Sequence, residues 1–311
     1  MPPPVPTRRS RFGGRGRASA YVRERAEAEG SEPSRLKMAL ASRGLSPRKR
    51  FGQNFLTRSD VAQRIVEQAR VRDDDVVVEI GPGTGALTAY LAARAARVVA
   101  IEMDDGLIEL LREELDAIPG LELVHADFLE VDLAEIAARH QTHRLAVVGN
   151  IPYNITTPIL ERLFEQRHVV RSAVLLVQKE YADRLAAPAG SPAYGALTLF
   201  ARYHAVLEPL MMVKASAFWP RPEVDSMLVR FMMRERAPVD VESEEMLFRI
   251  IRGSFHMRRK QLLNTLEATL ELPKEKIERL ARHARVDPRR RGETLTLDEF
   301  AKLANAAMDY A

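Results

Sequence analysis

The sequence predicts an α/β fold, in which a mostly parallel sheet with helices on both faces precedes a smaller all-α domain. Two observations support this fold class. Between about residues 57 and 204, short apolar runs alternate with helix-like stretches, which is typical of a parallel sheet covered on both sides. After about residue 241, helical periodicity continues to the C-terminus without a strand signal.

The expected strands are short and apolar. They lie at 76–80, 98–102, 121–125, 145–149 and 173–178, with two late, antiparallel strands at 209–215 and 227–233. Expected helices are 57–69, 86–96, 104–116, 156–166, 179–186, 194–204, 243–252, 255–270, 273–284 and 296–308. The chain is therefore divided into an N-terminal extension (1–33), an α/β domain (34–236) and a helical domain (237–311).

The composition excludes several classes of protein. No apolar run approaches the roughly 18 residues that cross a bilayer, and no signal peptide is evident, so a cytoplasmic protein is expected. The chain has no cysteine, which excludes disulfides, thiolate metal sites and a cysteine nucleophile. His140 and His143 lie in a polar stretch typical of a solvated helix end, so no metal site is expected.

Positive charge is concentrated at the N-terminus. The first 50 residues hold 13 Lys and Arg against 4 Asp and Glu, although the whole chain carries a formal charge of only +4. Residues 1–33 have few apolar side chains to bury, so we expect them to be disordered. They are either a basic arm that attracts RNA, a plain unstructured extension, or the product of a misassigned start codon.

A glycine-rich turn follows the first expected strand of the sheet. Gly81-Pro-Gly-Thr-Gly85 begins where strand 76–80 ends, and open α/β sheets bind ligands at that edge. Glycine lets the backbone turn tightly and approach a ligand closely. The spacing G-x-G-x-G differs from the dinucleotide pattern G-x-G-x-x-G, which favours S-adenosylmethionine over NAD. We expect Gly81 and Gly83 to contact this cofactor, although a purely structural turn is the alternative.

Two carboxylates end the next two strands. Glu102 lies about 20 residues past the glycines, where an acceptor-only group suits the hydroxyls of a ribose. Asp127 follows the third strand and is placed to hold the adenine amine of the cofactor. Either residue alone could be a helix cap or a surface charge. Together, after such a turn, they indicate a cofactor site.

The most specific segment of the chain is Gly149-Asn-Ile-Pro-Tyr-Asn154. The Asn150 side-chain oxygen and the Ile151 carbonyl can each accept an N–H bond from an exocyclic adenine amine, which would direct the nitrogen lone pair at the methyl group. Pro152 disfavours a helical conformation at Ile151. Tyr153 offers a face for base stacking. We expect these four residues to be catalytic.

A base inside a duplex cannot reach such a pocket, so the target must be flipped out or unpaired. Phe218, in a proline-rich loop, is the candidate for the opposite wall, where it would sandwich the base against Tyr153. An aromatic residue beside prolines is also common in ordinary loop packing. Two basic clusters are candidate phosphate contacts, or alternatively solvated helix faces. These clusters are Arg48, Lys49 and Arg50, and Arg258, Arg259 and Lys260.

Taken together, these motifs resemble the KsgA-type ribosomal RNA small-subunit adenine dimethyltransferases. The matching stretches run from Arg48-Lys-Arg-Phe-Gly-Gln-Asn-Phe-Leu56 through Glu79–Gly85, Gly149–Pro158 and Phe218–Ser226 to Arg258-Arg-Lys260. The resemblance implies a Rossmann-like methyltransferase fold and dimethylation of two adjacent adenines in the 3′-terminal hairpin loop of small-subunit RNA. It also implies a monomer acting in subunit assembly.

The same resemblance implies cofactor contacts from Asn54 and Leu56, besides Gly81, Glu102, Asp127 and Asn150. Ile151 stands where leucine is commoner in the family. Two other hypotheses about function remain open. One is an Erm-type enzyme that methylates a large-subunit adenine, and the other is a non-catalytic assembly or transcription factor on the same scaffold.

Overall fold

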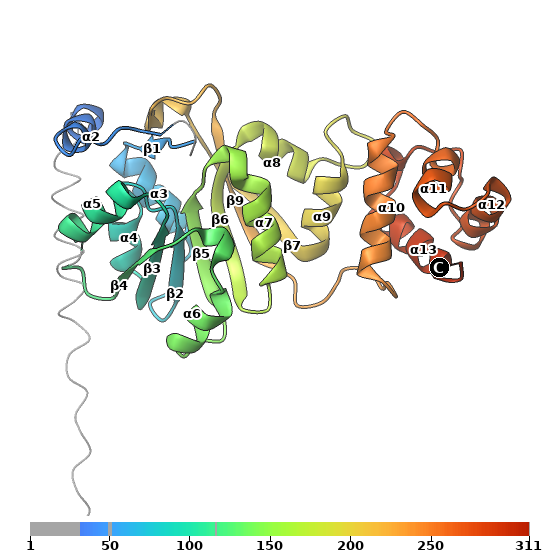
Figure 1. The fold of residues 1–311 in the computed structure, drawn as a ribbon, viewed down its shortest axis with the longest axis horizontal. Helices are drawn as coiled ribbons and strands as arrows, with labels where there is room; N and C mark the ends of the chain where they lie inside the picture. The colour runs from blue at the N-terminus through green and yellow to red at the C-terminus, as the bar shows by residue number, and fades with distance from the viewer. Residues whose placement is uncertain (1–31, 49–51, 116, 311) are drawn as a thin grey trace, which may run out of the picture. The chain divides into compact units, whose positions relative to one another are not determined.

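The computed structural model describes residues 32–48, 52–115 and 117–310, and these form two compact units (Figure 1). The first unit runs up to Gln178 and includes Pro209–Arg230; the second comprises Lys179–Glu208 and the chain from Phe231 onward. The predicted division at residue 236 stays a prediction. The compact units differ from it in that residues 179–208 group with the C-terminal helices. Residues 1–31 of the predicted extension lie outside the described residues.

A mostly parallel seven-stranded sheet forms the centre of the fold, in the order β4-β3-β2-β5-β6-β9-β7. The five strands from β4 to β6 in this order pair in parallel. The seven strands are β2 (Val76–Ile80), β3 (Arg97–Glu102), β4 (Leu121–His125), β5 (Leu145–Asn150), β6 (Val170–Gln178), β7 (Ala205–Val213) and β9 (Ser226–Met233). This arrangement confirms the predicted α/β fold class.

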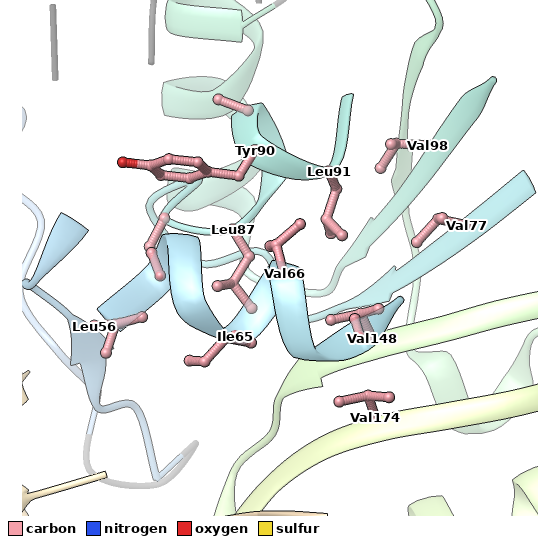
Figure 2. Close-up of a cluster of buried hydrophobic side chains, with 14 of the residues drawn as sticks. Leu56, Ile65, Val66, Val77, Leu87, Tyr90, Leu91, Val98, Val148 and Val174 are labelled. Carbon is pink, nitrogen blue, oxygen red and sulfur yellow. The ribbon is translucent and has the colours of Figure 1, made fainter. Parts of the chain in front are cut away.

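The strands at the centre of the sheet are buried on both faces. All five residues of β2 are buried, which explains why the run that predicted this strand is apolar except for Glu79. On one face, valines from neighbouring strands pack against α3 (Ser59–Ala69) and α4 (Thr88–Ala92), as Figure 2 shows. The labelled strand residues in that cluster are Val77, Val98, Val148 and Val174. Their burial makes the sheet a rigid support for the loops at its edge.

The remaining helices of the first unit are α2 (Glu32–Ala41), α5 (Asp105–Leu115), α6 (Leu133–Arg139) and α7 (Thr156–Glu165). α5 contacts β3 and β4, and α7 contacts β6. A separate two-stranded antiparallel ladder pairs β1 (Phe55–Leu56) with β8 (Phe218–Trp219). These short strands were not predicted from the sequence, and of α6 only the polar end near His140 was.

The second unit is mainly helical. Its helices are α8 (Lys179–Ala186), α9 (Ala196–His204), α10 (Glu244–His256), α11 (Leu262–Leu270), α12 (Lys274–His283) and α13 (Leu297–Met308). Apolar side chains from α9 to α13 form one core, which includes Leu199, Ile250, Leu266, Leu280 and Phe300. The predicted helix at 255–270 is wrong in its extent, because the chain leaves the helical path at Met257–Gln261.

Candidate active site

One cavity of the first unit lies at the carboxyl ends of the parallel strands. Its walls are the glycine turn after β2, the ends of β3 and β4, the loop after β5 and the segment Gly52–Leu56. Loops at this edge of a parallel sheet meet because all the strands point the same way. The structure therefore brings together residues that are up to about a hundred positions apart in the sequence.

The glycine turn has the backbone that the sequence predicted. Gly81, Gly83 and Gly85 have φ angles of 60°, 58° and 76°, in the left-handed region that favours glycine. A Cβ atom on Gly83 would meet Phe55 Cδ1 at 3.1 Å, and one on Gly85 would meet Leu115 Cδ1 at 2.8 Å. A Cβ on Gly81 would meet no protein atom within 4 Å. Because Gly81 also lines the cavity, it leaves a surface that a ligand can approach.

Gly81→Ala should therefore weaken cofactor binding more than its backbone strain explains. A left-handed alanine costs about 1–2 kcal/mol of folding free energy, and the added methyl group also occupies the surface of the cavity. Gly190 is a matched control, since its φ is 84° and its Cβ position is equally open. Calorimetry with S-adenosylhomocysteine should show weaker binding for Gly81→Ala only. Equal affinity in both variants would mean that Gly81 does not face the ligand.

Glu102 lies at the end of β3 and is buried. Its Oε1 accepts hydrogen bonds from the backbone N–H groups of Met103 and Asp104, both at 3.0 Å, and its Oε2 accepts one from Gly83 at 3.1 Å. Burial raises the pKa of Glu102, and these backbone donors oppose that rise. Three of its roughly four acceptor sites are thus in use, which leaves capacity for about one further strong hydrogen bond.

Asp127 also lines the cavity, and it has a structural task as well. Its Oδ1 accepts the Leu129 N–H at 2.9 Å and caps the short 3₁₀ helix Phe128–Glu130. The sequence offered a cap and a cofactor contact as alternatives for this residue. In the structure, the position is compatible with both, because the cap uses only one of the two carboxylate oxygens.

The corner after β5 holds the four residues predicted to be catalytic. Asn150, Ile151, Pro152 and Tyr153 all line the same cavity as the glycine turn. The Asn150 side-chain Nδ2 donates to the Asn54 carbonyl oxygen at 3.0 Å, which leaves Oδ1 as an acceptor. This bond joins the corner to the segment that contains Asn54 and Leu56, two predicted cofactor contacts.

Tyr153 is held from a distant part of the sheet. Its hydroxyl shares a 2.6 Å hydrogen bond with the Ser226 hydroxyl at the start of β9. Burial raises the pKa of Tyr153, so the phenol stays protonated at neutral pH. Pro152 adopts φ −60° and ψ 133° and precedes the 3₁₀ helix Tyr153–Ile155. The tyrosine ring is therefore positioned by fixed backbone rather than by a mobile loop.

Phe218 is not brought to this cavity. Its side chain is 4% exposed and belongs to the hydrophobic cluster that includes Leu56 and Ile65. In the short ladder Phe218 lies opposite Leu56, and the Thr57 N–H donates to the Ala217 carbonyl at 2.9 Å. The predicted sandwich of a base between Tyr153 and Phe218 is therefore not formed in this structure, because the core covers the phenylalanine ring.

Glu79 is a cavity residue that sequence reasoning did not assign. It lies inside β2, is 1% exposed and contributes to the cavity wall. Burial raises its pKa to about 8; the nearby Thr88 hydroxyl only partly offsets this, and the Glu102 carboxylate adds to it. Within the described residues, its Oε2 has no hydrogen-bond partner. The signal that could have revealed it is a single charge inside an apolar strand.

Glu79→Gln should stabilise the protein at alkaline pH. Below pH 4.5 the side chain is protonated in both states, whereas between pH 4.5 and about 8 only the unfolded chain releases the proton. The free energy of unfolding of the wild type therefore falls as pH rises through this window, by up to about 1.4 kcal/mol per pH unit. The neutral glutamine removes that loss.

Chemical denaturation at pH 5, 6.5 and 8 measures this effect. The stability of Glu79→Gln relative to wild type should increase from the lowest to the highest pH. Glu109→Gln, which alters an exposed glutamate on α5, should show no such trend. A constant difference across the three pH values would mean that Glu79 titrates normally in the folded protein.

Comparison with known proteins identifies the family. The family model described as "Ribosomal RNA adenine dimethylase" matches residues 44–309. The chain belongs to this family. It is 44% identical to "Ribosomal RNA small subunit methyltransferase A" of Geobacillus thermodenitrificans, an alignment that covers 89% of this chain and 96% of that protein. The protein of the same name from Anoxybacillus flavithermus is 42% identical over 88% of this chain and 94% of its own length.

Two solved structures extend the comparison. A dimethyladenosine transferase from Plasmodium falciparum is 25% identical with a TM-score of 0.69, over 80% of this chain and 95% of that one. The 23S rRNA methyltransferase ErmE is 28% identical with a TM-score of 0.63, over 81% and 99%. Family membership confirms that the chain is a methyltransferase with a Rossmann-like fold and that its cofactor is S-adenosylmethionine.

The residues that line the cavity also fit S-adenosylmethionine chemically. Gly81 presents backbone with open space above it, and a buried Glu79 oxygen lacks a protein partner among the described residues. Met103, beside Glu102, keeps a 41% exposed apolar side chain at the cavity wall. Backbone, carboxylate and apolar surface together match a ligand that combines a charged amino acid with a nucleoside.

The predicted RNA-binding residues have different environments. Arg258 donates from Nε to Glu293 Oε2 at 2.7 Å and from Nη2 to the carbonyls of Ser191 and Pro192, so it holds a loop of its own unit. Arg259 and Lys260 are exposed in the turn between α10 and α11. Their predicted place on a helix is wrong. Arg48 pairs with Asp104 at 3.1 Å, and Lys49 and Arg50 lie outside the described residues.

Two further findings concern the described part of the chain. It contains no group of three or more His, Asp or Glu side chains arranged to hold a metal ion. None of its helices is both long and apolar enough to cross a membrane.

Proposed function

We propose that this chain transfers two methyl groups from S-adenosylmethionine to N6 of each of two adjacent adenines in the 3′-terminal hairpin loop of small-subunit ribosomal RNA. One observation carries the proposal: the Asn150–Tyr153 corner and the Gly81–Glu102 wall face a single cavity. A base held at the corner lies beside a cofactor held at the wall. Such proximity and orientation account for a large part of the barrier in group transfer.

The Asn150–Tyr153 corner can orient the lone pair of an adenine amine toward the methyl group. The amine is a weak nucleophile because its lone pair is delocalised into the ring. Asn150 is oriented by its bond to the Asn54 carbonyl, so that its Oδ1 can accept one amine hydrogen. We assign the second acceptor to the Ile151 carbonyl and the stacking surface to Tyr153. S-adenosylmethionine supplies a methyl group on a sulfonium, and the proton leaves the amine after transfer.

We assign the cofactor contacts to the opposite walls of the cavity. Glu102 accepts a hydrogen bond from the ribose, and Asp127 accepts one from the adenine amine of the cofactor. Gly81 and Gly83 allow the close approach of the backbone, and the segment with Asn54 and Leu56 closes the cavity. Because the Phe218 ring is buried in the core, we assign it no contact with the base or the cofactor.

Similarity favours the small subunit over the large one as the source of the RNA. Proteins named for methylation of the small subunit are 41–44% identical to this chain, against 28% for the 23S rRNA methyltransferase ErmE. The exposed Arg259 and Lys260 are proposed phosphate contacts, together with Lys49 and Arg50. We further propose that residues 34–236 form the catalytic domain and residues 237–311 the RNA-binding domain, in a monomer that acts on assembling subunits in the cytoplasm.

Unmodified ribosomal subunits test this proposal directly. Small and large subunits, each lacking the modification, are incubated with the protein and labelled S-adenosylmethionine. The RNA of each subunit is then digested to nucleosides, which are identified by mass spectrometry. We expect N6,N6-dimethyladenosine in the small subunit alone. Label in the large subunit would favour the Erm-type activity, and no label in either, with cofactor still bound, would favour a non-catalytic assembly factor.

A further inference from the structure

The segment before the cavity is anchored on α5. Apolar side chains of this segment, Leu36, Leu40 and Leu45, pack with Leu107 and Leu110 of α5 and with Phe55 of the cavity wall. Arg43 adds an exposed ion pair to Glu113 at 2.9 Å. The chain therefore approaches the cavity along a fixed path that ends at Arg48, the last residue described before the gap at 49–51.

Arg48 meets a buried carboxylate at the end of that path. Its Nη1 lies 3.1 Å from Asp104 Oδ2, and the Asp104 side chain is only 3% exposed. Gln53 joins both partners: its Oε1 accepts the Arg48 backbone N–H at 2.8 Å, and its Nε2 donates to Asp104 Oδ2 at 3.3 Å. Gln53 also lines the cavity, so this network touches the wall directly.

Asp104 connects the network to the cofactor side of the cavity. Its Oδ1 accepts the Gly106 N–H at 3.0 Å at the start of α5, and its own N–H donates to Glu102 Oε1 at 3.0 Å. Glu102 in turn holds Gly83 of the glycine turn. A continuous series of polar contacts thus runs from Arg48 through Asp104 and Glu102 to the turn. Two buried carboxylates, Glu102 and Asp104, lie two residues apart in it, and Arg48 is the cation paired with Asp104.

We propose that Arg48 is a positioning residue of the cofactor site and not a phosphate contact. By holding Asp104 and Gln53, it fixes the end of β3 and the Gly52–Leu56 segment in the geometry that receives the cofactor. This rests on the proposed contacts of Glu102 and Asn54. It also assigns the first arginine of the Arg48-Lys-Arg50 cluster a different role from the one that its sequence neighbourhood suggested.

The test compares cofactor and RNA binding in the full-length protein. Arg48→Met keeps most of the side-chain volume but removes the charge. Its Kd for S-adenosylhomocysteine should rise about 5- to 10-fold by calorimetry, a change of about 1–1.4 kcal/mol. Arg48→Lys, which restores a cation without the planar fork, should recover part of the affinity. The KM for RNA and the salt dependence of RNA binding should be unchanged.

Arg43→Met is the matched control, because it removes an exposed ion pair from the same segment. It should alter neither affinity. A double-mutant cycle adds a test that is independent of overall stability. If Arg48 acts through Asp104, then Arg48→Met combined with Asp104→Asn should bind S-adenosylhomocysteine no more weakly than Asp104→Asn alone.

Two results would overturn the inference. The first is a normal Kd for S-adenosylhomocysteine in Arg48→Met together with weaker RNA binding and a salt slope lowered by about one, which marks a phosphate contact. The second is full additivity in the cycle with Asp104→Asn. Failure of the proposed cofactor site is distinguishable from both, because Glu102→Ala would then bind S-adenosylhomocysteine normally whatever the behaviour of Arg48.

Discussion

Asn150→Ala should lower kcat for methyl transfer by roughly 100- to 1000-fold, the cost typical of removing one positioned hydrogen-bonding group from a reacting centre. The alanine removes the acceptor oxygen that would orient the adenine amine. It also removes the Nδ2 donor that ties the corner to the Asn54 carbonyl. Single-turnover rates on unmodified small subunits measure this loss without interference from product release.

Cofactor binding provides the internal control for this variant. The Kd for S-adenosylhomocysteine should stay within about threefold of wild type, since most proposed cofactor contacts lie on other walls. Gln63→Ala, which removes an exposed side-chain amide from α3, should leave the rate unchanged. If Asn150→Ala methylates at the wild-type rate, the proposed orientation of the amine is wrong.

Glu102→Ala should raise the Kd for S-adenosylhomocysteine by roughly 10- to 100-fold. The carboxylate has capacity for about one further hydrogen bond, and a bond to a charged group contributes about 1.5–3 kcal/mol. The variant also leaves three backbone N–H groups without their acceptor, those of Gly83, Met103 and Asp104. Calorimetry gives the affinity, and thermal unfolding separates lost binding from lost stability.

Glu102→Gln distinguishes the two contributions. It keeps one oxygen, so part of the backbone bonding survives, but it removes the charge and half of the acceptor sites. We expect an affinity between those of the wild type and the alanine variant. Glu109→Ala on the exposed side of α5 should bind as the wild type does. Unchanged affinity in Glu102→Ala would remove the ribose contact from the site.

The central strands could be predicted closely because they are buried on both faces. Such strands appear in the sequence as largely apolar runs, and β2 begins and ends where its run does. The edge strand β4, which is only partly buried, also has the predicted bounds. The break at Met257–Gln261 could not be predicted, because that stretch contains neither glycine nor proline. The Leu262 and Leu263 N–H groups donate instead to the Arg290 and Pro288 carbonyls, which are distant in the sequence.

The candidate site could also be predicted only in part. Gly81 and Asn150 were predicted because each directly follows or ends a strand, and the structure places both in one cavity. Arg48 and Arg258 were interpreted from neighbouring charges, whereas their partners Asp104 and Glu293 lie 56 and 35 positions away. Pattern in a sequence shows the type of a side chain but not which buried acceptor it will meet.

The bond between Asn150 and the Asn54 carbonyl has a pharmacological consequence. A carboxamide can rotate by half a turn, and here that backbone carbonyl decides which end faces the nucleobase. A compound wedged between the two groups would free the amide to turn and present hydrogens where the purine needs an acceptor. Such a compound would enter the cavity where the Asn54 segment meets the Asn150 corner, so it would act from within the site without covering the RNA surface.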